Sequence, residues 1–331
     1  MRNILKNYKI FNLDPIKLRS KNFYKKTVDY DTHVFNKFKK AILTPSQFKC
    51  FLCGNTKGDK FLIYKKTYEL LECKKCGAVC PSIDFSKIDM AELNDDEKAN
   101  DNIKKQVYAT YDYRKKNYAT ERLNYLLEKT GLSKTDAKVL DVGCGPGYFI
   151  SHLKDKKIIN KGLEVSDFLV GMCKEMGLNA DSNDLSEEPE NYYNAITLFD
   201  VIEHLENPVS FFKTLNAKLD KRGYVLAYTP NIHSVAFMLM GERQNLLRPF
   251  LHLCFYDNRS LDYLAKKTGF EVASIDYYGL DLMDYLFMKQ YDDKFNYPAK
   301  MKEFIPVMQA IIDNQKLSNH MRIVFKKIKE V

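Results

Sequence analysis

Four cysteines in two pairs are the first residues whose types and spacing could do chemistry. Cys50 and Cys53 form one Cys-x-x-Cys-Gly segment, and Cys73 and Cys76 form a second one after nineteen residues. Two such pairs can close a tetrahedral zinc site. Because four sulfur ligands leave no open position on the ion, we expect a structural zinc rather than a catalytic one. Cys80 is a fifth candidate, so the choice of four ligands stays open.

A glycine-rich segment is the second pattern with chemical meaning. Residues 138–142 read as a buried strand, and glycines follow at alternate positions, Gly143, Gly145 and Gly147. Glycines allow tight turning and a close approach of the backbone to a ligand. A dinucleotide site would have the spacing G-x-G-x-x-G, but Tyr148 occupies the place of the last glycine. Asp141 at the strand end suits an ammonium group, so we expect a nucleoside ligand with a zwitterionic tail.

The elements that must position these residues follow from hydrophobic patterning. A hairpin is expected between the cysteine pairs, with strands at 60–65 and 67–72. From residue 137 onward, short apolar runs alternate with helical segments, and a helical stretch at 280–314 is longer than a crossover requires. The expected strands are 138–142, 161–165, 193–199, 224–228, 270–276 and 321–326, and the expected helices are 148–156, 168–176 and 208–219. This alternation predicts a doubly wound, parallel α/β sheet with ligands at the carboxyl ends of its strands.

The chain of 331 residues is expected to hold two folded units with connecting helices. We divide it into a basic N-terminal extension at 1–45, a zinc-binding module at 46–92, a helical linker or cap at 93–134 and a ligand-binding domain at 135–331. The module has too few residues for a self-sufficient core. We therefore expect zinc binding to supply much of its folding free energy.

The glycine-rich segment Val139-Leu-Asp-Val-Gly-Cys-Gly-Pro-Gly-Tyr-Phe149 resembles motif I of the class I S-adenosylmethionine-dependent methyltransferases. Residues 200–208, Asp-Val-Ile-Glu-His-Leu-Glu-Asn-Pro, are similar to the segment after the fourth strand of that family, and residues 228–231, Tyr-Thr-Pro-Asn, to the end of its fifth. The resemblance covers roughly residues 105–331. It implies a seven-stranded Rossmann-like sheet, S-adenosylmethionine as cofactor and methyl transfer as the activity.

The resemblance also implies roles for individual residues at the cofactor site. The three glycines would pass under the methionine part and the ribose, and Asp141 would help to hold the amino group. Glu164, seventeen residues after Gly147, would accept both ribose hydroxyls. Asp184 would accept from the adenine N6, Leu185 would pack on the ring, and Asp200 completes the expected cofactor set.

Methyl transfer requires an electron-rich atom about 3 Å from the methyl carbon and the removal of its proton. His252 is the first candidate base, because histidine titrates near neutral pH and this segment is expected to cross the mouth of the cleft. His204 could be a base, or it could join Asp200 and Glu203 in a divalent-metal site, as in some related O-methyltransferases. Tyr256 is a weaker catalytic candidate.

A Cys-x-x-Cys pair ahead of the catalytic domain resembles the deoxysugar C-methyltransferases and related surface-glycan enzymes, in which the zinc unit helps to cover the substrate cleft. Those enzymes carry a His-x-His segment where this chain has Leu251-His252-Leu-Cys-Phe-Tyr256, with one histidine only. We therefore leave the methylated atom open. The expected acceptor is a small polar molecule, either a nucleotide-linked sugar or a surface-glycan precursor.

The net charge of +9 is concentrated at the N-terminus, since residues 1–48 carry +8. We expect a solvated basic arm or a packing helix there. One alternative is an RNA or tRNA methyltransferase that grips nucleic acid with this arm and the zinc module. Another is a non-catalytic adapter that binds S-adenosylmethionine. Because no apolar run approaches the roughly 18 residues of a membrane helix, we expect no membrane span and a cytoplasmic protein.

Overall fold

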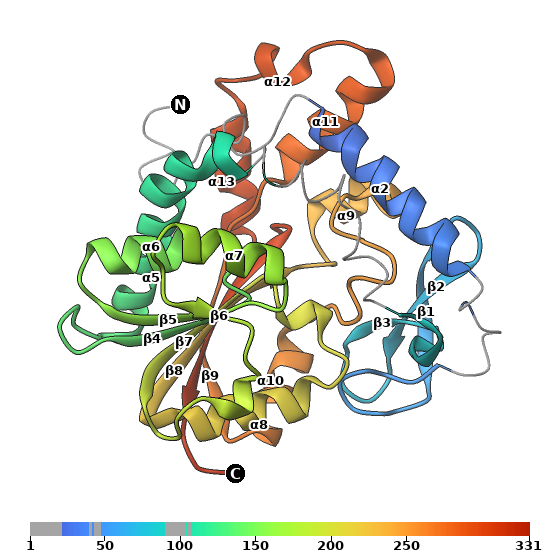
Figure 1. Ribbon diagram of the computed structural model, residues 1–331. Helices are drawn as coiled ribbons and strands as arrows, with labels where there is room; N and C mark the ends of the chain where they lie inside the picture. The colour runs from blue at the N-terminus through green and yellow to red at the C-terminus, as the bar shows by residue number, and fades with distance from the viewer. Residues whose placement is uncertain (1–21, 40–41, 43–47, 90–103, 105–106) are drawn as a thin grey trace.

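The computed structural model describes residues 22–39, 42, 48–89, 104 and 107–331. Seven strands form the main sheet in the order β6-β5-β4-β7-β8-β10-β9 (Figure 1). Their bounds are β4 (Lys138–Val142), β5 (Ile159–Leu163), β6 (Ala180–Asp181), β7 (Tyr193–Phe199), β8 (Leu219–Pro230), β9 (Phe270–Tyr277) and β10 (His320–Lys327). The expected seven-stranded Rossmann-like sheet is confirmed.

The expectation of a wholly parallel sheet is wrong at one strand. The pairs that join β6, β5, β4, β7 and β8 are all parallel, but β10 runs antiparallel to both of its neighbours, β8 and β9. The sheet is therefore mixed. Strand–helix alternation describes the order of elements along the chain, whereas strand direction depends on how the last strand returns to the sheet.

Helices cover both faces of this sheet. On one face, α5 (Thr120–Thr130) and α6 (Tyr148–Asp155) share an apolar cluster with the strands, with Leu123 and Phe149 at its centre. On the other face, α8 (Pro208–Lys218) and α10 (Asn258–Lys267) bury Phe212 and Leu264 in a second cluster. The helix α7 (Asp167–Glu175) packs near the edge, where Cys173 contacts the residues of α6. The doubly wound arrangement thus follows from apolar stripes on both sets of helices.

The cysteine module contains a small antiparallel sheet of its own. It has the strands β1 (Gly58–Tyr64), β2 (Tyr68–Cys73) and β3 (Val79–Pro81) in that order, followed by the short helix η4 (Phe85–Lys87). The predicted hairpin is β1–β2, whose tight end pairs Tyr64 with Tyr68. The third strand was not predicted, because three residues are too few for a recognisable alternation.

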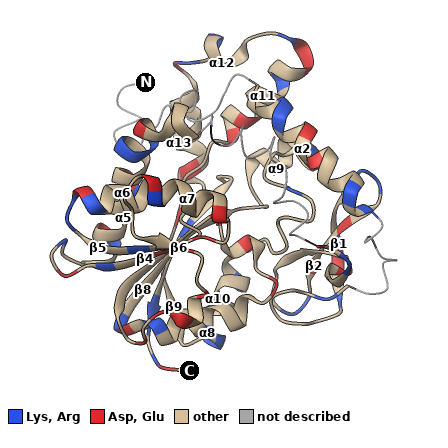
Figure 2. Ribbon diagram, viewed as in Figure 1, with Lys and Arg blue, Asp and Glu red and all other residues tan. Residues whose placement is uncertain are grey.

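The segment expected as a basic extension contains the helix α2 (Phe23–Phe38), which joins two parts of the molecule. Its Val34 and Phe35 pack in one apolar cluster with Tyr68 of the cysteine module. Its Tyr24 packs in another cluster with residues of α11 (Asp281–Asp293). Both basic and acidic residues lie along α2 (Figure 2), and Lys25 pairs with Asp29. The described part of the extension is therefore a packing helix, and residues 1–21 lie outside the described residues.

The remaining helices lie in the linker, in loops and in the C-terminal part of the chain. The linker is helical over residues 107–130, including the π-helix η5 (Arg114–Ala119), and Gly131 ends it with a φ of +70°. Residues 93–103, 105 and 106 of the predicted linker lie outside the described residues. The short helices η6 (Leu185–Glu187), η7 (Ile202–His204), α9 (Val235–Met240) and η8 (Gly241–Arg243) lie in loops, and α12 (Tyr297–Lys300) and α13 (Ile305–Asn314) occupy the predicted helical stretch. Among the described helices, none is long and apolar enough to cross a bilayer.

Candidate active site

The glycine loop between β4 and α6 is shaped by packing on one side and is open on the other. Gly143 and Gly147 have φ values of +71° and +80°. A Cβ on Gly143 would lie 2.6 Å from Val201 Cγ2, and one on Gly147 would lie 2.5 Å from Leu178 Cδ1. A Cβ on Gly145 would meet no described atom within 4 Å, although its φ is +55°. The loop therefore leaves an open surface over Gly145, as a cradle for a ligand requires.

Two carboxylates flank this loop at the ends of neighbouring strands. Asp141 on β4 is buried and accepts a hydrogen bond of 2.6 Å from Thr197 Oγ1. Burial raises the pKa of Asp141 to about 7. Glu164, just after β5, accepts from the Gly145 N–H at 2.9 Å and from the Ser166 N–H at 3.0 Å. Each carboxylate oxygen can accept a further hydrogen bond, so both residues fit a ligand with an ammonium group and hydroxyl donors.

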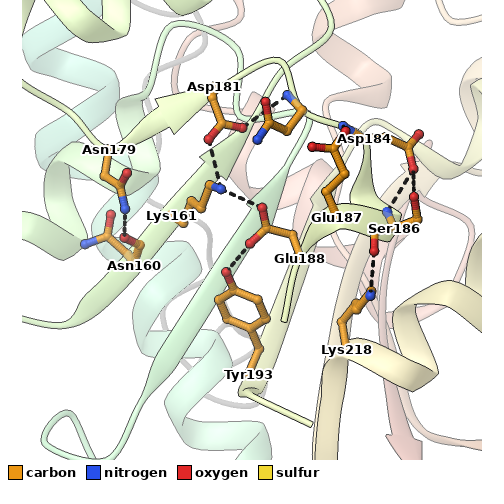
Figure 3. A network of polar contacts seen from close by, with 11 residues as sticks. Asn160, Lys161, Asn179, Asp181, Asp184, Ser186, Glu187, Glu188, Tyr193 and Lys218 are labelled. Carbon is orange, nitrogen blue, oxygen red and sulfur yellow. Dashed lines mark hydrogen bonds and ion pairs between the residues drawn. The ribbon is translucent and has the colours of Figure 1, made fainter. Parts of the chain in front are cut away.

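The loop after β6 is held by a polar network (Figure 3). Asp184 caps η6 and accepts from the Ser186 N–H at 2.8 Å, and Glu187 completes a capping box. Leu185 is buried in the main core. Lys161 holds the neighbouring strand end through Asp181 at 2.9 Å and Glu188 at 2.5 Å. The contacts of Asp184 with an adenine N6 and of Leu185 with its ring stay predictions.

A cavity of about 420 Å³ opens beyond the carboxyl ends of β7 and β8. Asp200 lies in its wall, next in the chain to the Val201 that contacts the glycine loop. The cavity therefore adjoins the predicted cofactor site. Its polar wall contains three histidines, three arginines and two carboxylates: His204, His252, His320, Arg114, Arg248, Arg322, Asp200 and Glu203.

Two of these histidines are fixed in one tautomer by their surroundings. His204 Nδ1 lies 2.8 Å from the carbonyl oxygen of Leu251, and His252 Nδ1 lies 2.7 Å from that of Leu246. Since a carbonyl oxygen only accepts, each Nδ1 carries the proton and each Nε2 keeps a lone pair. The ring centroids are 4.7 Å apart. Burial holds the pKa of His252 well below its ordinary value, which keeps this ring neutral.

Glu203 lies beside the two imidazoles. Its side chain is fully buried, and its Oε2 accepts a hydrogen bond of 3.0 Å from Thr229 Oγ1. Its Oε1 is buried without a hydrogen-bond partner among the described residues. Burial and the nearby charge of Asp200 raise the pKa of Glu203 well above its ordinary value. The predicted His204 and His252 are thus brought together, and Glu203 joins them.

The comparison with known families decides what kind of domain this is. Residues 111–275 match the family model described as "Methyltransferase domain". Residues 111–275 are thus identified as a methyltransferase domain. The ubiquinone biosynthesis O-methyltransferase of Vibrio campbellii is 28% identical over 138 residues, which cover 38% of this chain and 58% of that protein. The match thus spans less than two thirds of that relative.

Two further proteins are similar to parts of this chain. The enzyme of the same name from Pseudomonas aeruginosa is 23% identical over 169 residues, which cover 46% of this chain and 72% of that protein. The crystal structure of a SAM dependent methyltransferase from Archaeoglobus fulgidus superposes with a TM-score of 0.46 and 19% identity, covering 64% of this chain and 94% of that one.

The structure places two other predicted site residues, Tyr256 in the core and Asp200 in the cavity wall. Tyr256 is fully buried, and its hydroxyl donates to the Ile202 carbonyl oxygen at 3.0 Å, so it lies in the core and not in the cavity wall. Asp200 does face the cavity, where its Oδ1 lies 3.2 Å from His320 Nε2. His320 was missed by sequence reasoning, because only the insertion of β10 beside β8 brings it to the strand ends.

The segment that carries His252 is supported from the cysteine module. The Phe250 N–H donates a hydrogen bond of 2.9 Å to the Tyr68 hydroxyl on β2. The rings of these two residues also pack edge-on, with centroids 4.9 Å apart. The cavity wall itself receives Phe23 and Thr27 from α2. Thus α2 covers the cavity, while the cysteine module holds one of its walls from behind.

The four cysteines of the two predicted pairs converge. Their sulfur atoms all lie within 4.8 Å of one another, and the closest contacts are 3.5 Å from Cys50 to Cys76 and 3.5 Å from Cys53 to Cys73. Cys80 Sγ lies 3.9 Å from Cys50 Sγ, but it falls outside this group of four. The structure thus groups the four cysteines of the two pairs without Cys80.

Proposed function

We propose that this protein transfers a methyl group from S-adenosylmethionine to a hydroxyl oxygen of a small acceptor bound in the cavity. The observation that carries the proposal is the placement of two imidazoles, each with a free Nε2 lone pair, in a cavity that adjoins the glycine loop. The names of the curated relatives, which are O-methyltransferases, support oxygen as the methylated atom.

The residues that would hold the cofactor are those of the predicted set. Gly143, Gly145 and Gly147 would form its cradle, Asp141 and Glu164 would bind its amino and ribose groups, and Asp184, Leu185 and Asp200 would line the rest. The fit rests on the open face of Gly145 and on carboxylates with acceptor capacity left. When bound, the cofactor supplies an electrophilic methyl group on a sulfonium.

In this reaction the residues of the chain would orient the acceptor and assist the removal of its hydroxyl proton. As the C–O bond forms, the C–S bond breaks with its electron pair remaining on sulfur, and the hydroxyl proton must leave the oxygen. Glu203, His204 and His252 are the groups placed to weaken that O–H bond. Asp200 and His320 form a polar pair near them and could pass the proton to water.

The expected sugar or glycan acceptor is not supported by the relatives, which are named for ubiquinone biosynthesis. The cavity wall instead contains several flat rings, from Phe23, Tyr118, Tyr228 and Tyr278. Such walls favour an acceptor with an aromatic or otherwise apolar body. We therefore propose a small, hydroxylated aromatic acceptor in place of the sugar.

We also propose that Cys50, Cys53, Cys73 and Cys76 hold a structural zinc ion. A tetrahedral site with Zn–S bonds of about 2.3 Å needs sulfur atoms roughly 4 Å apart, and the observed group fits this size. The Asn55 side chain donates to Cys73 Sγ at 3.5 Å and would help to balance the charge of the thiolates.

Calorimetry and methyl-labelling test the main proposal. Titration with S-adenosylhomocysteine, the demethylated product, should show saturable binding at one site. Incubation of the protein with labelled S-adenosylmethionine and small-molecule extracts should then label an acceptor that mass spectrometry identifies. Failure to bind this ligand, together with binding of a nicotinamide or flavin nucleotide, would overturn the proposal.

A further inference from the structure

We propose that a second cavity, beside the acceptor cavity, binds the far end of the acceptor, and that this end is an uncharged, planar carboxamide group. The role toward the acceptor rests on the proposed function, but the binding of a carboxamide by itself does not. The second cavity has a volume of about 250 Å³. It lies between α2, the tip of the β1–β2 hairpin, residues 242–249 and α11.

The two cavities adjoin each other. Thr27 of α2 and Asn245 lie in the walls of both. A ligand with its hydroxyl group near His252 would therefore reach the second cavity by passing these two side chains. The volume of the second cavity is below the roughly 300 Å³ at which sites for whole ligands usually begin. It therefore suits one end of a longer molecule.

The amide of Asn245 is the observation that points to a ligand. This side chain is 4% exposed, and neither its Nδ2 nor its Oδ1 has a hydrogen-bond partner among the described residues. The adjacent Gln244 is 2% exposed and lies in the wall of the second cavity, and its Nε2 also lacks a partner within the described part of the chain. Buried polar atoms are nearly always hydrogen-bonded, because burial without a partner is costly. A ligand group with both an acceptor and a donor would remove this cost.

The charges around the second cavity favour an uncharged ligand. Four charged side chains lie in its wall, and they are balanced in pairs: Asp31 with Arg248, Arg243 with Asp292, and Glu242 with Lys65, whose backbone N–H donates to it. The ammonium group of Lys65 also donates to Thr32 Oγ1 at 3.0 Å. A charged ligand would therefore lose its hydration without gaining an unpaired charge of opposite sign.

The aromatic side chains of the second cavity favour a flat group. Tyr24, Tyr64 and Tyr291 lie in its wall, and the ring centroids of Tyr24 and Tyr291 are 5.6 Å apart. The hydroxyl of Tyr24 donates to the carbonyl oxygen of Arg243 at 3.0 Å, which fixes this ring. Aromatic rings pack well against planar groups. A carboxamide is planar, and its carbonyl and N–H groups match the unpartnered amide atoms of Asn245.

Saturation-transfer nuclear magnetic resonance with benzamide as the probe tests the subsite in the full chain supplied with zinc. We expect saturable binding of benzamide and weaker binding of benzoate, which is charged, and of toluene, which forms no hydrogen bonds. Asn245→Leu and Tyr291→Ala should each weaken benzamide binding at least about fivefold. His320→Gln, in the wall of the acceptor cavity alone, and Asn314→Leu, at an exposed position, are the controls. Both controls should bind benzamide as the wild type does.

Steady-state kinetics with the acceptor identified by methyl-labelling tests the second half of the proposal. Asn245→Leu should raise the KM for this acceptor at least about fivefold and change kcat by less than about twofold, because Asn245 would contact the far end of the acceptor and not the reacting hydroxyl. A structural role of Asn245 would lower kcat and the melting temperature instead.

The proposal is overturned if the wild type does not bind benzamide, or if Asn245→Leu and Tyr291→Ala bind it normally. Weaker binding in His320→Gln but not in Tyr291→Ala would place the probe in the acceptor cavity and would also overturn it. Thermal melting checks that each variant folds, and Tyr291→Ala, at a half-buried position, carries the test if Asn245→Leu does not fold. If benzamide binds as expected while S-adenosylhomocysteine does not, the proposed function fails and the carboxamide site stands.

Discussion

Val79 and Phe255 exchange both of their backbone hydrogen bonds, at 3.0 Å from Val79 N to Phe255 O and at 2.9 Å in the reverse direction. Val79 begins the third strand of the cysteine module, and Phe255 lies three residues after His252. The small sheet is thereby continued by the segment that carries this histidine. The folding of the cysteine module and the position of His252 in the cavity are therefore coupled.

Removal of one of the four cysteines should affect both the cysteine module and the segment that carries His252. We expect Cys50→Ser to lose the proposed metal and to lower the melting temperature, because the ion would supply much of the module's folding free energy. Cys80→Ser is the matched control, since Cys80 lies outside the group of four. Atomic absorption and thermal melting measure both effects. A metal that survives in Cys50→Ser, or that disappears in Cys80→Ser, would contradict the assignment.

Tyr68→Phe should loosen the same connection without touching the metal. The change leaves the buried Phe250 N–H without its acceptor, which costs about 1–3 kcal/mol of unfolding free energy. Urea unfolding measures the loss, and Tyr192→Phe, at an exposed position, serves as the control. Equal stabilities of the two variants would show that the Tyr68 hydroxyl contributes little.

Affinity for the cofactor product should depend on pH through Asp141. Burial raises the folded-state pKa of this carboxyl from 3.8 to about 7, with Glu164 adding to the shift and Thr197 and Arg122 opposing it. An ammonium group prefers the ionised form, so affinity for S-adenosylhomocysteine should rise with pH through this range. Calorimetry at several pH values should show that rise, and Asp141→Asn should abolish it.

The titration of Asp141 should also affect stability: as pH rises, the free energy of unfolding should fall, whereas the affinity for S-adenosylhomocysteine should rise. The pKa of Asp141 is higher in the folded state than in the unfolded state. Between these two pKa values the folded state therefore binds more protons than the unfolded state, and protonated Asp141 favours folding. This contribution to the unfolding free energy is lost as pH rises through about 7. Asp141→Asn should therefore flatten the pH dependence of the unfolding free energy of the unliganded chain. An unchanged slope would show that Asp141 titrates normally.

Two glycine variants should separate packing from ligand contact. Gly147→Ala places a Cβ 2.5 Å from Leu178 Cδ1 at a positive φ, so a large loss of stability is expected. Gly145→Ala meets open space, and its strain of roughly 1–2 kcal/mol should leave the fold intact while it blocks the cofactor. Melting and calorimetry together test this. Normal cofactor binding by Gly145→Ala would place the ligand elsewhere.

His252→Ala should lower turnover on the identified acceptor by about two orders of magnitude or more, with nearly unchanged affinity for S-adenosylhomocysteine. The reason is that His252 lies in the acceptor cavity and not in the glycine loop. Initial-rate kinetics measures the turnover, and calorimetry measures the affinity for S-adenosylhomocysteine. Near-normal turnover would remove His252 from the reaction.

The local patterns of the sequence determined much of this protein. The alternation of apolar runs located β4 and β7 to the residue, because buried strands need continuous apolar character. The spacing of the cysteines predicted their convergence, because each pair is only three residues apart and the hairpin brings the pairs together. The glycines marked the loop that we propose as the cofactor cradle, since only glycine tolerates those φ values next to Val201 and Leu178.

Tertiary structure alone decided which residues share the cavity. The direction of β10 brought His320 to Asp200, and the crossing of residues 246–256 brought His252 to Glu203 while turning Tyr256 into the core. These contacts join residues far apart in sequence, and each depends on side-chain direction and strand order. Such contacts leave no local pattern in the sequence, because they form only when elements that are distant in sequence pack together.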